Sequence, residues 1–274
     1  MATEAELLAD VIAAPFDDAP RVAFADFLDA QAGGASPRAE FIRLQLALMH
    51  PMTAAPPGAS TNPDDEIGRR MDYLQNQQRE KALLTQHEAA WTANLRRAAS
   101  EVRFDRGFAV SAVVEASAFV QYGQWLLQQA PIVHIELRGV LPQLDAIVAC
   151  PALAGVKALS LHGQGLDDDA LVRLLASPHL GQLWWLELGS NSIGMKGADA
   201  LAAAGLAGLR YAGFRGNPID PHETAGVDGQ SIQDVALPPE GEALEGKHGF
   251  LPWLHYPTTS MLDFPPNPHR APPP

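Results

Sequence analysis

Hydrophobic residues recur at a nearly constant spacing over the second half of the chain. Short segments in which apolar and polar residues alternate begin with Phe108, Ile135, Leu159, Leu186 and Ala212, so consecutive segments lie 27, 24, 27 and 26 residues apart. Alternation predicts a β-strand in each segment, and helical patterns such as those at 169–175 and 197–201 lie between the strands. Strands joined by helical crossovers pair in parallel. The pattern therefore predicts an α/β fold with a parallel sheet.

A period of this length resembles that of leucine-rich repeats. The most complete copy, W-L-E-L-G-S-N at 185–191, carries the L-x-L-x-x-N core of that repeat. The helical returns and the spacing are most similar to repeats of the ribonuclease-inhibitor type. The resemblance implies a short solenoid with a parallel concave sheet and convex helices. Asn191 and Asn217 stand where a side-chain amide satisfies backbone groups after the strand, whereas Gln164, Val140 and Val113 stand at the matching places.

The first fifty residues predict a helical unit. Thr3 and Glu6 form a capping box at the start of a first helix, and Ser36-Pro37 opens a third. The segments at 7–15, 21–28 and 37–45 resemble the short "repeat-companion" domain, and R-F-x-R-G-F at 103–108 and A-P-I-V-H-I at 130–135 resemble the stretch that opens the repeats in the same proteins. That domain precedes leucine-rich repeats in large bacterial families. The resemblance covers most of residues 1–217 and implies an architecture and an interaction role, but no activity.

A linker and a long helix are expected between this unit and the repeats. Residues 52–63 are rich in Pro, Ala and Gly, and Asn62-Pro63 then starts a helix whose apolar stripe continues to about residue 99. We expect this helix to cap the first repeat, because an uncapped solenoid exposes its core. The stripe consists of Ile67, Met71, Leu74, Leu84, Trp91 and Leu95.

The predicted organisation therefore has four parts. Residues 1–50 form the helical unit, 51–105 the linker and capping helix, 106–220 about five degenerate repeats, and 221–274 an acidic, Pro-rich cap or tail. The tail closes with P-P-N-P-H-R-A-P-P-P, which favours extended polyproline II. Its one apolar cluster, at 250–256, either packs over the last repeat as a cap or serves as a docking motif for a partner.

Charge and cysteine content narrow the classes of partner and compartment. The net charge of −13, from 19 basic and 32 acidic residues, argues against nucleic acid and anionic membranes and suits a basic protein partner. Cys150 is the single cysteine, so a reducing compartment is expected, with this residue in the core. The acidic N-terminus lacks the basic region of a signal peptide, and no apolar run reaches the ~20 residues that span a bilayer. We expect a cytoplasmic protein.

Strand alternation places the residues that flank the inward leucines on the concave face, in three rows. Trp185 and Tyr211 share a row on neighbouring strands, and aromatic side chains beside charges are typical of interface hot spots. The rows are Gly107, His134, Ala158, Trp185 and Tyr211; Ala109, Glu136, Ser160, Glu187 and Gly213; and Ser111, Arg138, His162, Gly189 and Arg215.

Nine residues of these rows are the candidates for partner binding. The alternative for Trp185 is burial beneath the C-terminal segment as core, and the alternative for the charged residues is a solvated face. The candidates are His134, Glu136, Arg138, Ser160, His162, Trp185, Glu187, Tyr211 and Arg215.

Motifs typical of catalysis are missing from the sequence. His134, Glu136 and His162 are of metal-ligand types, but three converging ligands at a recognised spacing are not found. The acidic run at 167–169 precedes a helix and is explained by capping. We therefore predict a protein that is not an enzyme, without cofactor or metal; the rival hypothesis is a metal-dependent hydrolase that uses those three residues.

The sequence as a whole predicts a protein–protein interaction module that holds its partner on the concave face. A specific version is an inhibitor or immunity protein that neutralises a bacterial toxin or enzyme. A further alternative is a scaffold that recruits partners through the Pro-rich tail. The sequence leaves open which partner is bound and whether the chain forms oligomers.

Overall fold

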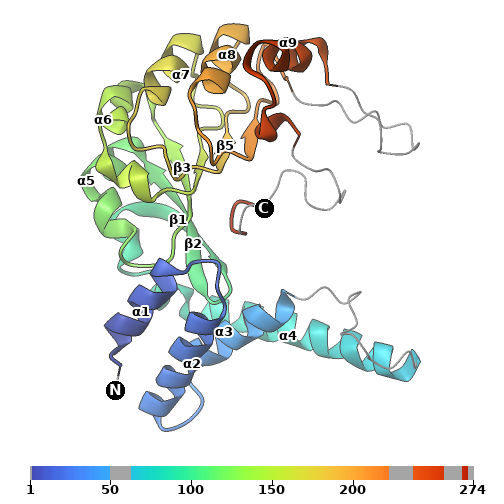
Figure 1. Ribbon diagram of the computed structural model, residues 1–274. Coiled ribbons are helices and arrows are strands. Elements are labelled where there is room, and N and C mark those ends of the chain that lie inside the picture. Colours follow the sequence, from blue (N-terminus) through green and yellow to red (C-terminus); the bar gives the residue numbers. More distant parts are fainter. Residues whose placement is uncertain (1, 50–62, 222–236, 256–266, 271–274) are drawn as a thin grey trace. The chain divides into compact units, whose positions relative to one another are not determined.

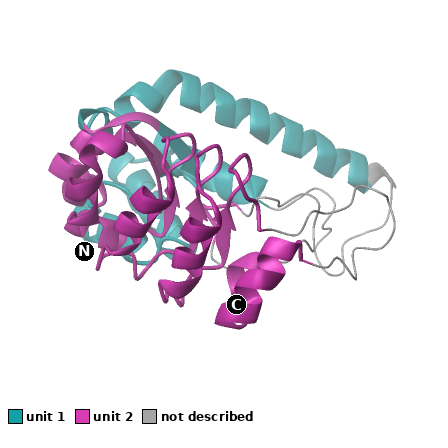
Figure 2. Cartoon of the chain, turned by 90° about the horizontal axis from the view of Figure 1, so that it is seen from above, with its two compact units in different colours: residues 1–97, 102–110, 128–131 teal, residues 98–101, 111–127, 132–274 magenta. Residues whose placement is uncertain are grey.

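The computed structural model of the chain describes residues 2–49, 63–221, 237–255 and 267–270 (Figure 1). The chain divides into two units (Figure 2). Unit 1 comprises residues 1–97, 102–110 and 128–131, and unit 2 comprises residues 98–101, 111–127 and 132–274. The expected linker and most of the expected polyproline tail lie outside the described residues.

Local capping signals set the ends of the N-terminal helices. Helix α1 (Glu4–Ala13) begins with the predicted capping box: the amide of Glu6 donates to Thr3 Oγ1 over 3.3 Å, and the amide of Thr3 donates to Glu6 Oε2 over 2.8 Å. Helix α2 (Ala19–Ala32) ends at Gly33, whose φ of 66° suits a residue without Cβ. Helix α3 (Pro37–Leu48) starts with proline at its first position, as predicted.

The core of unit 1 forms where these helices meet the start of strand β2 (Phe108–Glu115). Phe24 packs edge-to-face on Phe108, with ring centroids 5.3 Å apart. The expected apolar faces of the helices are therefore buried together. The cluster contains Val11, Phe24, Ala25, Ala39, Ile42 and Phe108, with Leu7, Leu8, Leu28 and Leu46 packed against it.

The long helix α4 (Pro63–Trp91) packs on α3, where the guanidinium of Arg79 donates two hydrogen bonds to Glu40 over 2.6 and 2.7 Å. Its predicted apolar stripe is buried only in part. Ile67, Met71 and Leu74 are 62%, 51% and 43% exposed, and the first fully buried residue among its described side chains is Leu83. The helix also ends earlier than expected and is followed by the short 3₁₀ helix η1 (Leu95–Arg97).

A β-hairpin begins at Ala99, where the predicted long helix was expected to end. Strand β1 (Ala99–Asp105) and strand β2 (Phe108–Glu115) are joined by Arg106 and Gly107, with φ of 49° and 82°. Two successive positive φ values are typical of the tight turns that join antiparallel strands. The sequence analysis did not predict β1 and placed these residues in the expected linker and capping segment, 51–105.

Strands β2 to β6 form a parallel array, which confirms the predicted α/β class and parallel sheet. The sheet has the order β1-β2-β3-β4-β5-β6, and each pair from β2 to β6 is parallel. From β2 to β6, strand order follows chain order because each connection returns through a helix to the next position. The later strands are β3 (His134–Arg138), β4 (Ala158–Ser160), β5 (Trp185–Glu187) and β6 (Tyr211–Gly213).

The connections carry the helices that cover one face of this sheet (Figure 1). The predicted cap at the start of α7 is confirmed, since Asp167 Oδ1 accepts a hydrogen bond of 2.8 Å from the amide of Ala170. Cys150 is buried, as expected for a core residue. The helices are α5 (Ala116–Leu126), α6 (Leu144–Val148), α7 (Asp168–Leu175) and α8 (Met195–Ala203), with η2 (Leu141–Gln143) and η3 (Pro151–Gly155).

The C-terminal region contains a helix that the sequence analysis missed, α9 (Pro239–His248), followed by η4 (Pro252–Leu254). Lys247 and His248 of α9 both contact Asp199 of α8, over 2.6 and 2.8 Å. The Trp253 ring lies 6.0 Å from that of Phe214, next to β6, and this part of the apolar cluster is buried as a cap requires. Among the described helices, none combines the length and hydrophobicity needed to cross a lipid bilayer.

Candidate binding face

The face of the sheet opposite helices α5 to α8 is called the open face here. Successive side chains of a strand point to opposite faces. Ile135, Leu159 and Leu186 are at most 1% exposed and belong to the helix-covered side, as the sequence predicts for the inward leucines. Their neighbours in the strands, which include His134, Trp185 and most other candidate residues, therefore belong to the open face.

Strand register brings the predicted rows together from β3 to β6. His134 pairs with Ala158, Ala158 with Trp185, and Trp185 with Tyr211. The second row is likewise formed, because Glu136, Ser160, Glu187 and Gly213 pair in succession.

The predicted register of the first strand is wrong by four residues. Ser111, rather than Gly107, pairs with His134, and Val113, rather than Ala109, pairs with Glu136. The cause is the hairpin: Gly107 lies in its turn, and β2 runs on to Glu115. Ser111 was expected in the third row and in fact begins the first.

Aromatic rings contact one another along the first row, from Tyr211 through Trp185 to His134. The ring of Trp185 lies nearly parallel to that of Tyr211, with centroids 5.3 Å apart and 22° between the planes. On its other side the Trp185 ring contacts the His134 ring edge-on, with centroids 5.2 Å apart. The two rings reach each other across the intervening strand because Ala158, the residue of that strand in this row, has a small side chain. Ser111 Oγ lies 2.9 Å from His134 Nδ1 at the end of the row.

A carboxylate in the second row is held in place beside this stack. Tyr211 donates a hydrogen bond from its hydroxyl to Glu187 Oε2 over 3.0 Å, and the amide of Gly189 donates to Glu187 Oε1 over 2.6 Å. Burial, followed by the charge of Glu187, raises the pKa of Tyr211 above its usual range. On strand β3, Arg138 of the third row donates two hydrogen bonds to Oε1 of Glu136 in the second row, over 3.1 and 3.2 Å.

Exposure divides the candidate residues into three groups. Trp185, for which the sequence left both exposure and burial open, is buried, and the expected solvent exposure of Tyr211 is wrong. Both of these rings are 4% exposed. The described C-terminal segment at 267–270 lies beside the row, with the His269 ring 5.5 Å from that of His134. This contact agrees with the alternative in which the C-terminal segment covers Trp185. The groups are His134, Ser160, Trp185 and Tyr211 (buried), Glu136 and Glu187 (half-buried), and Arg138, His162 and Arg215 (exposed).

The two asparagines behave as the repeat pattern predicts. Asn191 Nδ2 donates to the carbonyls of Leu161 and Leu188 over 2.9 and 2.7 Å, and its Oδ1 accepts from the amide of Leu166 over 3.0 Å. Asn217 donates in the same way to Leu188 and Phe214. These amides join successive turns after the strands and so help to hold the open face in shape.

The described residues do not form the cluster of metal-ligating side chains that the metal-dependent hydrolase hypothesis requires. Among them, no group of three or more His, Cys, Asp or Glu side chains converges to hold a metal ion, and His134, Glu136 and His162 therefore do not form such a group. His134 instead contacts Ser111 and Trp185, whereas His162 is exposed.

The chain matches no known protein family, and no curated protein or solved structure is significantly similar to it. The fold class is α/β, with a six-stranded, mostly parallel sheet.

Proposed function

We propose that this protein is a non-enzymatic binding module, a short solenoid of the leucine-rich-repeat kind that holds a protein partner on its open face. The proposal is carried by one contact: a segment of the chain itself, residues 267–270, lies against the open face through His269 and His134. A face that accommodates a polypeptide segment of its own chain has the shape and chemistry to accept one from another protein.

The composition of the open face supports a protein ligand. Stacked aromatic rings flanked by charged groups are the residues on which interface energy usually concentrates. Arg138, His162 and Arg215 are exposed beside the buried stack and are available as polar contacts around it. Because the row is held by strand pairing and by Asn191 and Asn217, little ordering is needed on binding.

The charge balance favours a particular kind of partner. A net charge of −13 suits a basic protein, and an inhibitor or immunity protein that occludes a toxin or enzyme in the cytoplasm is the specific version that we put forward. The resemblance of the first fifty residues to a repeat-companion domain fits such an interaction role.

A quantitative affinity capture from the native cell lysate tests the proposal, with the full chain as bait. The variant Arg138→Ala/Arg215→Ala removes two exposed side chains beside the row without adding negative charge that would attract a basic partner, and Arg173→Ala/Lys196→Ala removes two exposed charged side chains on α7 and α8 as the matched control. We expect a protein that the wild type and the control capture equally and the first variant loses. Equal capture by all three folded baits would remove the open face as the binding site.

Deletion of residues 257–274 separates this proposal from the scaffold alternative. If the C-terminal segment competes with the partner for the open face, its removal raises the captured amount. If the Pro-rich tail itself recruits the partner, its removal abolishes capture.

A further inference from the structure

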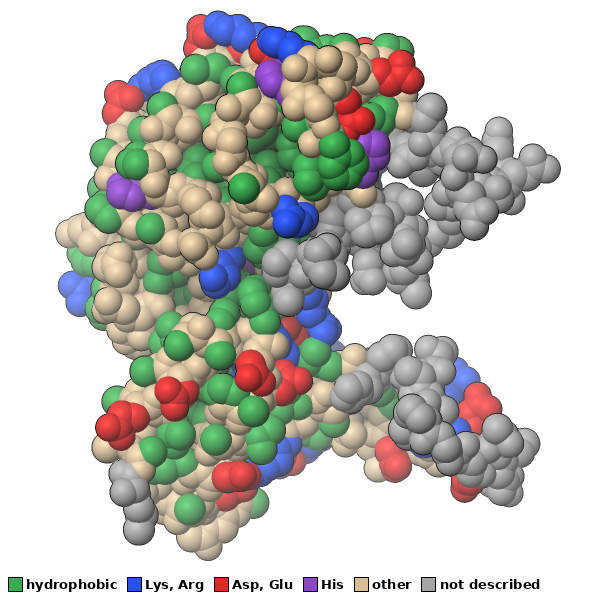
Figure 3. All heavy atoms as spheres, viewed as in Figure 1, with side chains coloured by type: hydrophobic (Ala, Val, Ile, Leu, Met, Phe, Trp, Pro, Cys, Tyr) green, Lys and Arg blue, Asp and Glu red, His purple; other side chains and the backbone are tan. Residues whose placement is uncertain are grey.

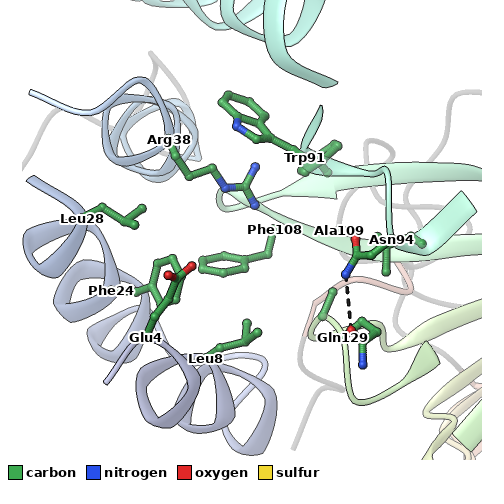
Figure 4. Close-up of a pocket in the computed structure, with 13 residues that line it drawn as sticks. Glu4, Leu8, Phe24, Leu28, Arg38, Trp91, Asn94, Phe108, Ala109 and Gln129 are labelled. Carbon is green, nitrogen blue, oxygen red and sulfur yellow. Dashed lines mark hydrogen bonds between the residues drawn. The ribbon is translucent and has the colours of Figure 1, made fainter. Parts of the chain in front are cut away.

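A second candidate site lies within unit 1, in a cavity of about 320 Å³. This volume is at the lower end of the range for small-molecule sites. Figure 4 shows the cavity between α1, α2 and α3 on one side and the start of β2 on the other. Its walls are mostly apolar or aromatic. Besides Arg38, the lining consists of Glu4, Leu8, Phe24, Leu28, Trp91, Asn94, Leu95, Phe104, Phe108, Ala109, Gln129 and Ala130.

Arg38 brings a positive charge into this apolar cavity. Its side chain extends from α3 towards the ring of Phe108 (Figure 4). The guanidinium carbon lies 4.6 Å from the centroid of Trp91 and 5.3 Å from those of Phe104 and Phe108. Burial lowers the pKa of Arg38 to about 9, so the group is still charged at neutral pH.

The edge of this guanidinium has no acceptor in the described chain. Arg38 makes no hydrogen bond or ion pair with the described residues, and its Nη1 is shielded from solvent. Aromatic faces attract a cation through their quadrupole, but they do not accept the in-plane N–H groups as oxygen atoms do. A buried charged donor without a partner is costly and is typical of functional sites.

Two buried arginines of unit 1, Arg21 and Arg106, are held mainly by backbone carbonyls, although Nε of Arg21, like Nη1 of Arg38, has no hydrogen-bond partner among the described residues. Arg21 donates to the carbonyls of Pro15 and Arg106 over 2.6 and 3.1 Å. Arg106 donates to the carbonyls of Phe16 and Pro15 over 2.8 and 2.9 Å and also contacts Asp18. Arg38 differs from both, because its side chain lines a cavity and meets rings rather than carbonyl oxygens.

We propose that this cavity binds a small monocarboxylic acid with an apolar or aromatic body. The carboxylate would accept paired hydrogen bonds from Arg38, a geometry in which guanidinium and carboxylate match. The body would fill the space beside Phe24, Phe108 and Leu8, where apolar contact stabilises it. This site is separate from the open face and does not depend on its function.

The charges around the cavity select a monoanion over phosphate groups. Arg38 is the only cationic residue of the lining, and Glu4 adds a negative charge to it. Figure 3 shows acidic side chains on the surface of the N-terminal helices. Glu6, Asp10 and Asp26 of these helices are exposed. Each further negative charge on a ligand is repelled by these groups, whereas one carboxylate is neutralised by Arg38.

Binding of phenylacetate to the full-length protein, measured by calorimetry and ligand-observed NMR, tests the inference. Phenylacetamide has nearly the same shape without the charge, and inorganic phosphate has charge without the apolar body. The variant Arg38→Gln removes the cation, and Arg43→Gln removes an exposed arginine from the same helix as the control. Indole-3-acetate and hexanoate extend the set of acids to larger and non-aromatic bodies.

We expect saturable binding of at least one acid, and an affinity for its amide or for phosphate that is weaker by about tenfold or more. Arg38→Gln should lose the acid, and Arg43→Gln should bind it within about twofold of wild type. If no acid binds at up to about 10 mM, or if acid and amide bind equally, the inference is wrong. Should Arg38→Gln fail to fold, the comparison of acid with amide on the wild type still decides.

Discussion

The hydroxyl of Tyr211 donates a hydrogen bond to the carboxylate of Glu187, with 3.0 Å between Oη and Oε2. The two residues lie on neighbouring strands, one in the first row of the open face and one in the second. The same carboxylate approaches Gly213 so closely that a Cβ there would lie 2.2 Å from Oε2. Glu187 is thus held by its neighbours, and the aromatic row and the charged row form one connected surface.

Removing this hydroxyl is expected to destabilise the protein. In Tyr211→Phe the carboxylate loses a charge-assisted hydrogen bond while staying half-buried, so the free energy of unfolding should fall by about 1–2 kcal/mol. Urea denaturation followed by circular dichroism measures the change. Tyr73→Phe on α4 is the control and should change the free energy by less than about 0.5 kcal/mol. Equal effects of the two substitutions would mean that the Tyr211 hydrogen bond contributes nothing.

The raised pKa of Tyr211 predicts how the chain behaves in alkali. Burial and the charge of Glu187 stabilise the neutral phenol in the folded state. The folded pKa lies above the unfolded value of about 10, so this contribution to stability is complete below that pH and is lost as the pH rises above it.

Ultraviolet titration should therefore show a phenol that does not ionise until the protein unfolds. In Tyr211→Phe this late phase should be missing. Ionisation of Tyr211 in the folded protein would contradict the buried environment.

Asn191 should be among the least replaceable polar residues of unit 2. In Asn191→Ala the amide of Leu166 and the carbonyl of Leu161 lose this partner in a buried place, whereas the carbonyl of Leu188 keeps its hydrogen bond from Asn217, and the cost is about 2–4 kcal/mol. Gln164→Ala is the matched control, because that residue stands at the corresponding place of the previous repeat and its side chain, among the described residues, donates only to the nearby carbonyl of His162. Gln164→Ala should lower the free energy of unfolding by less than about 0.5 kcal/mol. Similar losses of stability in the two variants, measured by thermal denaturation, would contradict the role given to Asn191.

Gly107 is predicted to tolerate no side chain. Its φ is 82°, and an added Cβ would lie 2.4 Å from Ile42 Cγ1 and 2.6 Å from Ile42 Cα. Gly107→Ala should therefore lower the free energy of unfolding by about 3 kcal/mol or more, through strain and overpacking together. Gly33→Ala also has a positive φ but open space around the added atom, and should cost only about 1–2 kcal/mol. Chemical denaturation of both variants isolates the contribution of the close approach to Ile42.

Several features followed from the sequence because they depend on residues close together in the chain. Capping at Thr3 and Asp167 involves partners three residues away. The strands at Ile135, Leu159 and Leu186 follow from alternation and a regular period, and the same period places the asparagines. Parallel pairing then follows from the length of the crossovers, and the rows from β3 to β6 follow from parallel pairing.

Other features were decided only by the tertiary structure. The helical stripe of α4 was visible in the sequence, but Ile67 and Leu74 of this stripe are exposed, because periodicity shows which residues share a face and not whether that face is covered. Leu83, which the predicted stripe did not include, is buried. The shift of β2 by four residues came from the turn at Gly107, whose close neighbour Ile42 lies far away in the chain.

The candidate sites show the same division. The sequence brought Trp185, Tyr211 and Glu187 onto one face, because strand alternation determines the direction of each side chain. It did not determine that the rings of Trp185 and Tyr211 are buried, nor that Arg38 lies among Trp91, Phe104 and Phe108. Those properties depend on which distant segments meet, and solvent exposure and the partners of a charge are set by that meeting rather than by neighbours in the chain.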